Sequence, residues 1–257
     1  MSRYPAVTDD VVKWAVMRQA WNNLLFVHWP VSPEVVDQRL PRGITADVFG
    51  GTAWVGLAAF QKERVGATRI RVPYLGNFPE TNVRTYVRGP DGRPGVWFDS
   101  LDIARLVPAL MSRLTYGLPY MWSKMSIAES GTQRRYECRR RFGGRGATSS
   151  IRAEIGPAIS PGDVSPLERF LTCRWGLYSR YASRLLYAPV EHPEWPLHRA
   201  TLLDMEDELA WVAGYPSPES PPLVHWTPGV EVRIGRRRRV VLARRSARDL
   251  SVAPLGS

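Results

Sequence analysis

The stretch that decides the fold is Glu80-Thr-Asn-Val-Arg-Thr-Tyr-Val-Arg88, in which two kinds of side chain alternate. Successive side chains of an extended strand point to opposite faces. One face of this strand therefore carries four polar or amphipathic groups, and the other carries β-branched residues. A turn-rich segment, residues 89–94, and a second apolar run, residues 95–101, follow it. This order predicts a β-hairpin. The members of the polar face are Glu80, Asn82, Arg84 and Tyr86.

The polar face of this strand has two interpretations. If it lies in solvent, the strand is an ordinary amphipathic one. If it lines the interior of a barrel, its charged groups must be paired or must meet a charged ligand. Arg84 is then suited to grip a carboxylate with two hydrogen bonds, and Glu80 could serve as a general acid or base.

Apolar runs and turn residues outline the rest of the chain. Many short strands with few helices favour an α+β fold that is mostly antiparallel, such as a barrel. Pro33 at a helix start and Gly117 near a helix end suit their positions. Strands are expected at residues 21–29, 52–60, 121–129, 132–142, 147–155, 185–190, 200–205 and 230–234, and helices at 34–40, 103–116 and 166–173.

The length and the net charge of the chain limit its possible domain organisation. A chain of 257 residues with 44% hydrophobic residues can bury a sizeable core. We expect one domain, residues 1–235, and a basic, flexible tail, residues 236–257. The net charge is +11, and the eight arginines within residues 233–248 account for most of it. Such a run could bind nucleic acid through phosphate contacts. Without an accompanying nucleic-acid-binding motif, a mobile tail is the preferred interpretation, and no specific nucleic-acid partner is expected.

Several classes of protein are excluded or disfavoured. Two cysteines, Cys138 and Cys173, are too few for a disulfide framework or a cysteine-rich zinc site. The chain has no phosphate-binding glycine loop, zinc-protease motif or nucleophile elbow. The segment from His192 to His198 contains two histidines and Glu194, but its prolines favour a kinked loop over a metal site. We expect no metal and no cofactor. The sequence also lacks a membrane-spanning run and a signal peptide, which predicts a cytoplasmic protein.

A second cluster of interest surrounds one of the three lysines. Lys124 follows Tyr120 and Trp122, and Tyr116 lies just upstream. A lysine desolvated among aromatic rings can act as a nucleophilic amine. The alternative is that Lys124 lies on the outer face of a strand.

Six segments together resemble the YqjF-like family, domain of unknown function 2071. The resemblance runs in order through the first half of the chain and continues more weakly to about residue 234. The segments are Trp21-Asn-Asn-Leu-Leu-Phe-Val-His-Trp29, Leu40-Pro41, Gly51-Thr-Ala-Trp-Val-Gly-Leu-Ala-Ala-Phe60, Phe78-Pro-Glu-Thr-Asn-Val-Arg-Thr-Tyr-Val87, Pro94-Gly-Val-Trp-Phe-Asp-Ser-Leu-Asp102 and Leu118-Pro-Tyr120.

This family is similar to the acetoacetate decarboxylase-like superfamily, which implies a β-barrel with a central cavity and a few peripheral helices. Enzymes of that superfamily form a Schiff base on a lysine that follows a proline. Here Pro119 is followed by Tyr120 and Met121, so that lysine is missing from its expected place. Glu80 matches one pocket glutamate of the superfamily, whereas the second would fall near Val55, where no acid stands.

Two functions are carried forward. The first is a lyase-type enzyme for a keto acid or other carbonyl compound, without the usual Schiff-base lysine, that catalyses decarboxylation, aldol-type addition or dehydration. The alternative is a non-catalytic barrel that binds an organic acid or a hydrophobic ligand. Either binds a small molecule and no membrane, and a homo-oligomer is left open. The candidate catalytic residues are Glu80, Arg84, Tyr120 and Lys124, and the candidate substrate-binding residues are His28, Trp54, Asn82, Tyr86 and Tyr116.

Overall fold

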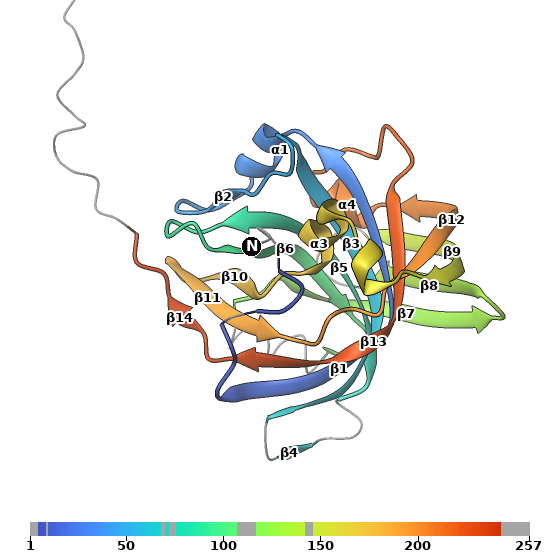
Figure 1. Cartoon of the computed structure of the whole chain (residues 1–257), viewed down its shortest axis with the longest axis horizontal. Coiled ribbons are helices and arrows are strands. Elements are labelled where there is room, and N and C mark those ends of the chain that lie inside the picture. The colour runs from blue at the N-terminus through green and yellow to red at the C-terminus, as the bar shows by residue number, and fades with distance from the viewer. Residues whose placement is uncertain are drawn as a thin grey trace, which may run out of the picture.

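The computed structural model describes residues 5–8, 10–67, 70–71, 76–106, 117–141 and 146–242. Strands dominate these residues, and the helices are short (Figure 1). The strands are β1 (Ala15–Val31), β2 (Thr45–Ala46), β3 (Ala53–Ala67), β4 (Ile70–Arg71), β5 (Phe78–Arg88), β6 (Pro94–Ile103), β7 (Tyr120–Ser130), β8 (Gln133–Arg140), β9 (Thr148–Ala158), β10 (Gly176–Tyr181), β11 (Arg184–Glu191), β12 (His198–Asp207), β13 (Leu223–Gly235) and β14 (Arg238–Arg239). The helices are α1 (Pro33–Asp37), α3 (Pro166–Thr172) and α4 (Leu209–Val212), with a 3-10 turn at Pro161–Asp163.

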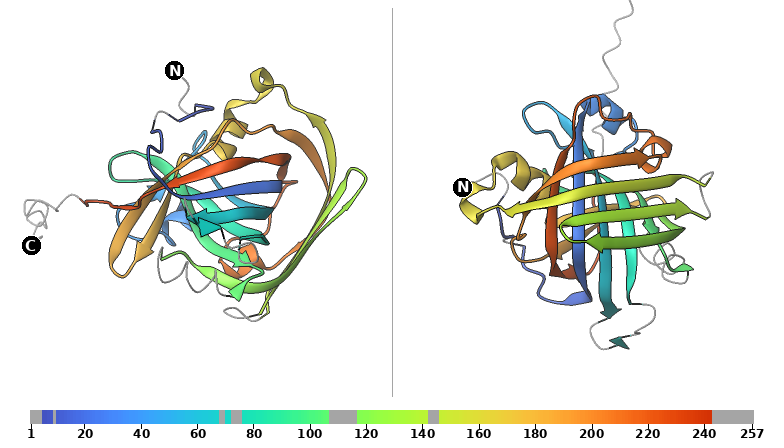
Figure 2. Two further views of the ribbon diagram at one scale, coloured as in Figure 1. Left: turned by 90° about the horizontal axis from the view of Figure 1, so that it is seen from below. Right: turned by 90° about the vertical axis from the view of Figure 1, so that its right-hand side faces the viewer.

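Nine of the described strands close into a ring through their hydrogen bonds. The ring runs β1, β3, β5, β6, β7, β8, β9, β12, β13 and back to β1. Within it only the β6–β7 pair is parallel, and it pairs Leu101 with Tyr120. Figure 2 shows β7, β8 and β9 as a curved wall that crosses the directions of β1 and β3. The prediction of a mostly antiparallel barrel is confirmed.

A second, smaller ring shares five strands with the nine-strand ring. From β6 the sheet continues through β10, which pairs in parallel with Val96 and Trp97, then through β11 to β13. The smaller ring therefore contains β1, β3, β5, β6, β10, β11 and β13. Strands β1, β3 and β5 separate the two interiors, and both faces of their central residues are buried.

Two apolar clusters lie in the interiors on either side of these three strands. In the nine-strand ring, Leu57 of β3 packs in a cluster with Tyr136 and Ile151 of β8 and β9. In the smaller ring, Phe60 of β3 belongs to a cluster with Val190 and Trp195. The alternation along β3 thus sends successive side chains into different interiors.

A bulge in β1 changes which residues face each interior. Asn23 has a φ of +48°, and the pairing with β3 shifts between Asn22 and Leu25. Asparagine tolerates this left-handed conformation better than most residues. Trp21 and Leu24 consequently both face the smaller ring, although they are three positions apart in the strand.

Most elements agree with their sequence-based predictions. The hairpin of β5 and β6 is confirmed, with Thr85 paired to Trp97. The three consecutive antiparallel strands β7, β8 and β9 are also confirmed. Helix α1 ends at Asp37, three residues before the predicted end. The helix expected over residues 103–116 falls mainly outside the described residues, and its first residue, Ile103, instead ends β6.

The sheet pairing extends past the expected domain boundary at residue 235. Strand β14 pairs with Leu186 and Tyr187 of β11. Arg238 also forms an ion pair with Asp10 at 3.1 Å. The segment just after the boundary is therefore attached to the smaller ring. No helix within the described part of the chain is long and apolar enough to cross a membrane.

A buried ion pair inside the nine-strand ring gives a stability prediction. Arg140 donates from Nε and Nη2 to the two oxygens of Asp102 at 2.8 and 2.7 Å. Removing one partner of such a pair leaves an uncompensated charge, so Arg140→Met should lower the free energy of unfolding by about 3–5 kcal/mol. Urea denaturation at pH 7 measures this.

The control is Arg139→Met, because Arg139 is exposed on the opposite face of β8. We expect it to change stability by no more than about 0.5 kcal/mol. Replacing both partners of the buried pair, as Asp102→Leu with Arg140→Met, should recover most of the lost stability. An equal loss in Arg139→Met and Arg140→Met would contradict this account.

Candidate functional site

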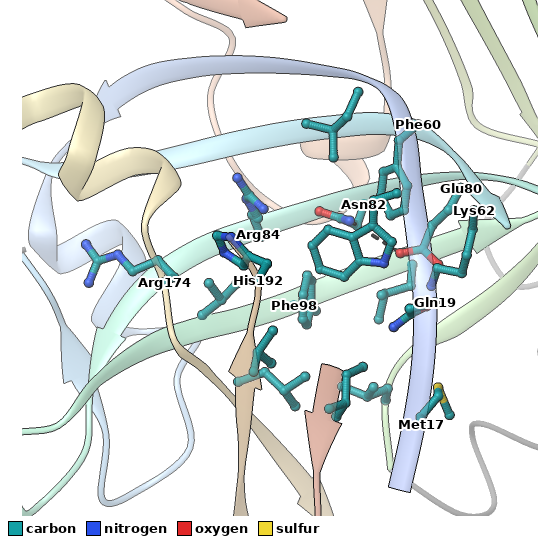
Figure 3. Close-up of a pocket in the computed structure, with 18 of the residues that line it drawn as sticks. Met17, Gln19, Phe60, Lys62, Glu80, Asn82, Arg84, Phe98, Arg174 and His192 are labelled. Atoms are coloured by element: carbon teal, nitrogen blue, oxygen red, sulfur yellow. Dashed lines mark hydrogen bonds and ion pairs between the residues drawn. The ribbon is translucent and has the colours of Figure 1, made fainter. Parts of the chain in front are cut away.

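A cavity of about 110 Å³ lies inside the smaller ring. A single water needs roughly 10–15 Å³ on this measure, so the cavity has room for a small organic molecule. Strands β1, β3, β5, β6, β10, β11 and β13 all contribute to its lining (Figure 3). Its wall is mostly apolar and aromatic, with a few convergent polar groups, as is usual for a ligand site. Those polar groups are Gln19, Lys62, Glu80, Asn82, Arg84, Tyr120, Thr172, Arg174 and His192.

The polar face of β5 lines this cavity and does not lie in solvent. Glu80, Asn82 and Arg84 are 2%, 3% and 7% exposed, and all three border the cavity. The opposite face is buried as well, for Val83 packs in the cluster of the nine-strand ring. Of the two interpretations of this strand, the interior one describes the structure.

Lys62 and Glu80 form an ion pair at one end of the cavity (Figure 3). Lys62 is only 5% exposed, and its Nζ lies 5.6–5.9 Å from the ring centres of Phe60, Phe78 and Tyr120. Asn82 Nδ2 donates a hydrogen bond to the other oxygen of Glu80 at 3.4 Å. This end therefore holds an amine and a carboxylate in contact, within a largely apolar wall.

Arg84 lies toward the other end and has no ion-pair partner among the described residues. Its guanidinium carbon lies 4.9 Å from the centre of the Phe26 ring, and its Nε is enclosed without a hydrogen-bond partner. The two other buried cations of the cavity differ, because Lys62 binds Glu80 and Arg174 binds Asp47 at 2.6 Å. A buried cation without a counter-ion is expensive, which favours an anionic ligand at Arg84.

His192 borders the cavity near Arg84 (Figure 3). Its ring packs against Trp175 and Trp195, whose ring centres are 4.4 and 4.5 Å away. Its Nδ1 is 2.7 Å from the carbonyl oxygen of Pro193. Burial lowers the pKa of His192 to about 4, and the positive charge of Arg84 also lowers it. The imidazole is therefore neutral at physiological pH.

Lys124, one of the candidate catalytic residues, does not border this cavity. It is exposed on β7, opposite Arg139, beside a separate surface hollow. After Trp122, strand β7 no longer pairs with β6 and runs beside β8 in the nine-strand ring. Tyr120, which precedes this divergence, does line the cavity.

Three candidate substrate-binding residues are buried or half-buried outside the cavity lining. Tyr86 donates a hydrogen bond to the carbonyl oxygen of Leu171 at 2.6 Å, and its oxygen lies 2.6 Å from His28 Nε2. His28 must then donate through Nε2, which fits a pKa held well below its ordinary value by burial. Trp54 packs in the same cluster as Tyr86. Tyr116 lies outside the described residues.

Lys62 and His192 are the functional candidates that sequence reasoning missed. A signal for Lys62 existed, because it lies two residues beyond Phe60 and thus on the same face of an extended β3. The signal for His192 was weaker, since it depends on tryptophans distant in the sequence. His198, which was considered together with His192, instead contacts Trp226 and the Gly156 carbonyl group. Among the described residues, no group of three metal-ligating side chains lies close enough to hold a metal ion.

Comparison with solved structures defines the class of fold. An acetoacetate decarboxylase-like enzyme from Sphingomonas wittichii RW1 is similar with a TM-score of 0.62 and 14% identity, over 91% of this chain and 96% of that one. The enduracididine biosynthesis enzyme MppR, complexed with pyruvate, has a TM-score of 0.61 and 15% identity, over 91% of this chain and 93% of MppR. Acetoacetate decarboxylase from Legionella pneumophila has a TM-score of 0.59 and 12% identity, over 88% of each chain. The fold is acetoacetate decarboxylase-like.

Sequence comparison then gives the family. The model of the DUF2071 family, described as an uncharacterized conserved protein, matches residues 18–231. The uncharacterized protein YqjF of Bacillus subtilis (strain 168) is 31% identical over 214 residues, which are 82% of this chain and 87% of YqjF. The chain belongs to the DUF2071 family, as the sequence resemblance indicated.

Proposed function

We propose that this protein is a lyase-type enzyme that acts on a keto acid or another carbonyl compound carrying a carboxylate. The observation that carries the proposal is the buried Arg84, whose guanidinium has no ion-pair partner among the described residues of the cavity. A guanidinium binds a carboxylate through two parallel hydrogen bonds. The fold neighbour MppR, which is complexed with pyruvate, supports a small keto acid as ligand.

The opposite end of the cavity supplies the reactive groups. Lys62 and Glu80 are in contact there, so Glu80 can take a proton from the Lys62 ammonium group. The free amine can then add to the carbonyl carbon of the ligand, and the carbonyl oxygen leaves as water. The resulting iminium ion accepts the electron pair of a broken carbon–carbon or carbon–hydrogen bond. Asn82 and Tyr120 position the ligand between Arg84 and Lys62.

Product analysis by proton NMR tests this function. The purified protein is incubated with pyruvate, 2-oxobutanoate and acetoacetate, each with and without an aldehyde acceptor. We expect at least one keto acid to be converted, and the conversion to stop in Glu80→Gln. Saturable binding with every ligand recovered unaltered would favour the alternative, a non-catalytic binding barrel. The absence of binding of all three keto acids would contradict the proposed function and leave only a barrel for a different ligand.

A further inference from the structure

The hydrogen bond of His192 to the main chain fixes the position of its proton. A carbonyl oxygen only accepts, so Nδ1 must donate to Pro193 across the 2.7 Å contact. In the neutral ring the lone pair is then on Nε2. The rings of Trp175 and Trp195 also pack against the imidazole, so this orientation is set before any ligand binds.

The Nε2 atom of His192 is available for chemistry. It has no hydrogen-bond partner among the described residues, and unlike Nδ1 of His28 and of His225 it is not enclosed. His192 borders both the inner cavity and an outer hollow that opens beside it, and Gln19 borders both as well. Nε2 is therefore a free proton acceptor on a residue that borders both spaces.

Burial and the nearby positive charge of Arg84 keep His192 unprotonated. Glu191 is engaged by Arg233 at 2.9 Å and by the Val12 amide at 2.6 Å. Glu194 is held by Arg169 at 3.0 Å. Burial lowers the pKa of His192 to about 4, and the positive charge of Arg84 adds to this lowering. A carboxylate bound to Arg84 would offset that charge and make Nε2 a stronger base.

Building on the proposed function, we propose that His192 is the general base of the cavity and that its Nε2 removes a proton from the carbon beside the carbonyl group of a keto acid held by Arg84. The carbon–hydrogen bond breaks, its electron pair forms the carbon–carbon double bond of an enolate or enamine, and the proton moves to Nε2. The imidazolium returns the proton to the same carbon or gives it to a leaving hydroxyl group. No further reactant is needed.

Proton exchange into solvent tests this role. Pyruvate is incubated with the protein in D2O, and loss of its methyl proton signal is followed by NMR. A general base contributes about 10²–10⁴-fold, so His192→Gln should slow exchange at least about 100-fold while pyruvate binding changes only a few-fold. Exchange by the unaltered protein should decline toward acid with one ionisation, and the residual exchange of the variant should lack that decline.

The matched control is His198→Gln, because His198 also pairs Nδ1 with a backbone carbonyl oxygen, that of Gly156, but does not border the cavity. This variant should catalyse the exchange of pyruvate protons at the same rate as the unaltered protein. Normal exchange in His192→Gln would overturn the assignment. If pyruvate binds to the unaltered protein but its protons do not exchange, the assignment of His192 is overturned as well, while the proposed binding site still stands. Pyruvate, 2-oxobutanoate and acetoacetate that all fail to bind would overturn both the assignment and the proposed function.

Discussion

The variant Arg84→Met should bind pyruvate at least about 30-fold more weakly than the unaltered protein. The guanidinium supplies two hydrogen bonds to a carboxylate, and each such bond to a charged group contributes about 1.5–3 kcal/mol. Loss of about 2 kcal/mol corresponds to the 30-fold change in Kd. Methionine keeps most of the apolar stem that lies against Phe26. Trp21 and Trp195 line the cavity, so quenching of tryptophan fluorescence reports the binding.

The stability of the same variant separates a ligand-binding role from a structural one. A buried cation without a counter-ion destabilises the fold, so Arg84→Met should leave the melting temperature unchanged or raise it. The control is Arg135→Met, because Arg135 is exposed on β8 and should leave the Kd for pyruvate unchanged. A fall in melting temperature with an unchanged Kd would assign Arg84 to the packing of the core and contradict its role as the anion site.

The second large effect is expected at Lys62. Replacing it by methionine removes the amine that the proposed reaction needs, so turnover of a keto acid should become undetectable. Binding should remain, because Arg84 still holds the carboxylate. Steady-state rates and a fluorescence titration together measure the two effects. Equal turnover by the variant and the unaltered protein would exclude amine catalysis.

A second variant guards against misfolding in this test. Lys62→Met leaves Glu80 buried without its cation, which can cost about 3–5 kcal/mol. The pair Lys62→Met with Glu80→Gln removes both charges and should restore stability without restoring turnover. Lys124→Met serves as the matched control, because Lys124 is exposed on β7 and should keep full turnover. Loss of turnover in Lys124→Met would instead assign the catalytic amine to Lys124.

The alternation along residues 80–88 was sufficient to predict a hairpin strand and its polar face. It could not decide which side that face lies on, because a solvated strand and a strand lining a polar cavity have the same pattern. The structure differs from the simple amphipathic case because Thr81, Val83 and Thr85 are buried too. These residues are buried because the second face of β5 points into the nine-strand ring. The closure of that ring depends on pairings between segments that are distant in the sequence.

The two missed residues show where local patterns stop being informative. Strand β3 was predicted to end at Phe60, because a charged segment follows, yet its pairing with β1 and β5 continues and carries Lys62 into the cavity. His192 is oriented by the carbonyl group of Pro193 and by two tryptophan rings. Lys124 is the opposite case. Its aromatic neighbours in the sequence suggested a position in a pocket, but β7 no longer pairs with β6 after Trp122 and Lys124 is exposed.

Borohydride trapping tests the central claim most directly. The protein is incubated with pyruvate, reduced, digested and examined by peptide mass spectrometry. The account predicts one adduct, on Lys62, that is absent from Lys62→Met and greatly diminished in Arg84→Met. The two exposed lysines, Lys13 and Lys124, are internal controls for non-specific reduction. A pyruvate adduct on either of them with none on Lys62, or no adduct although pyruvate is converted, would contradict the account.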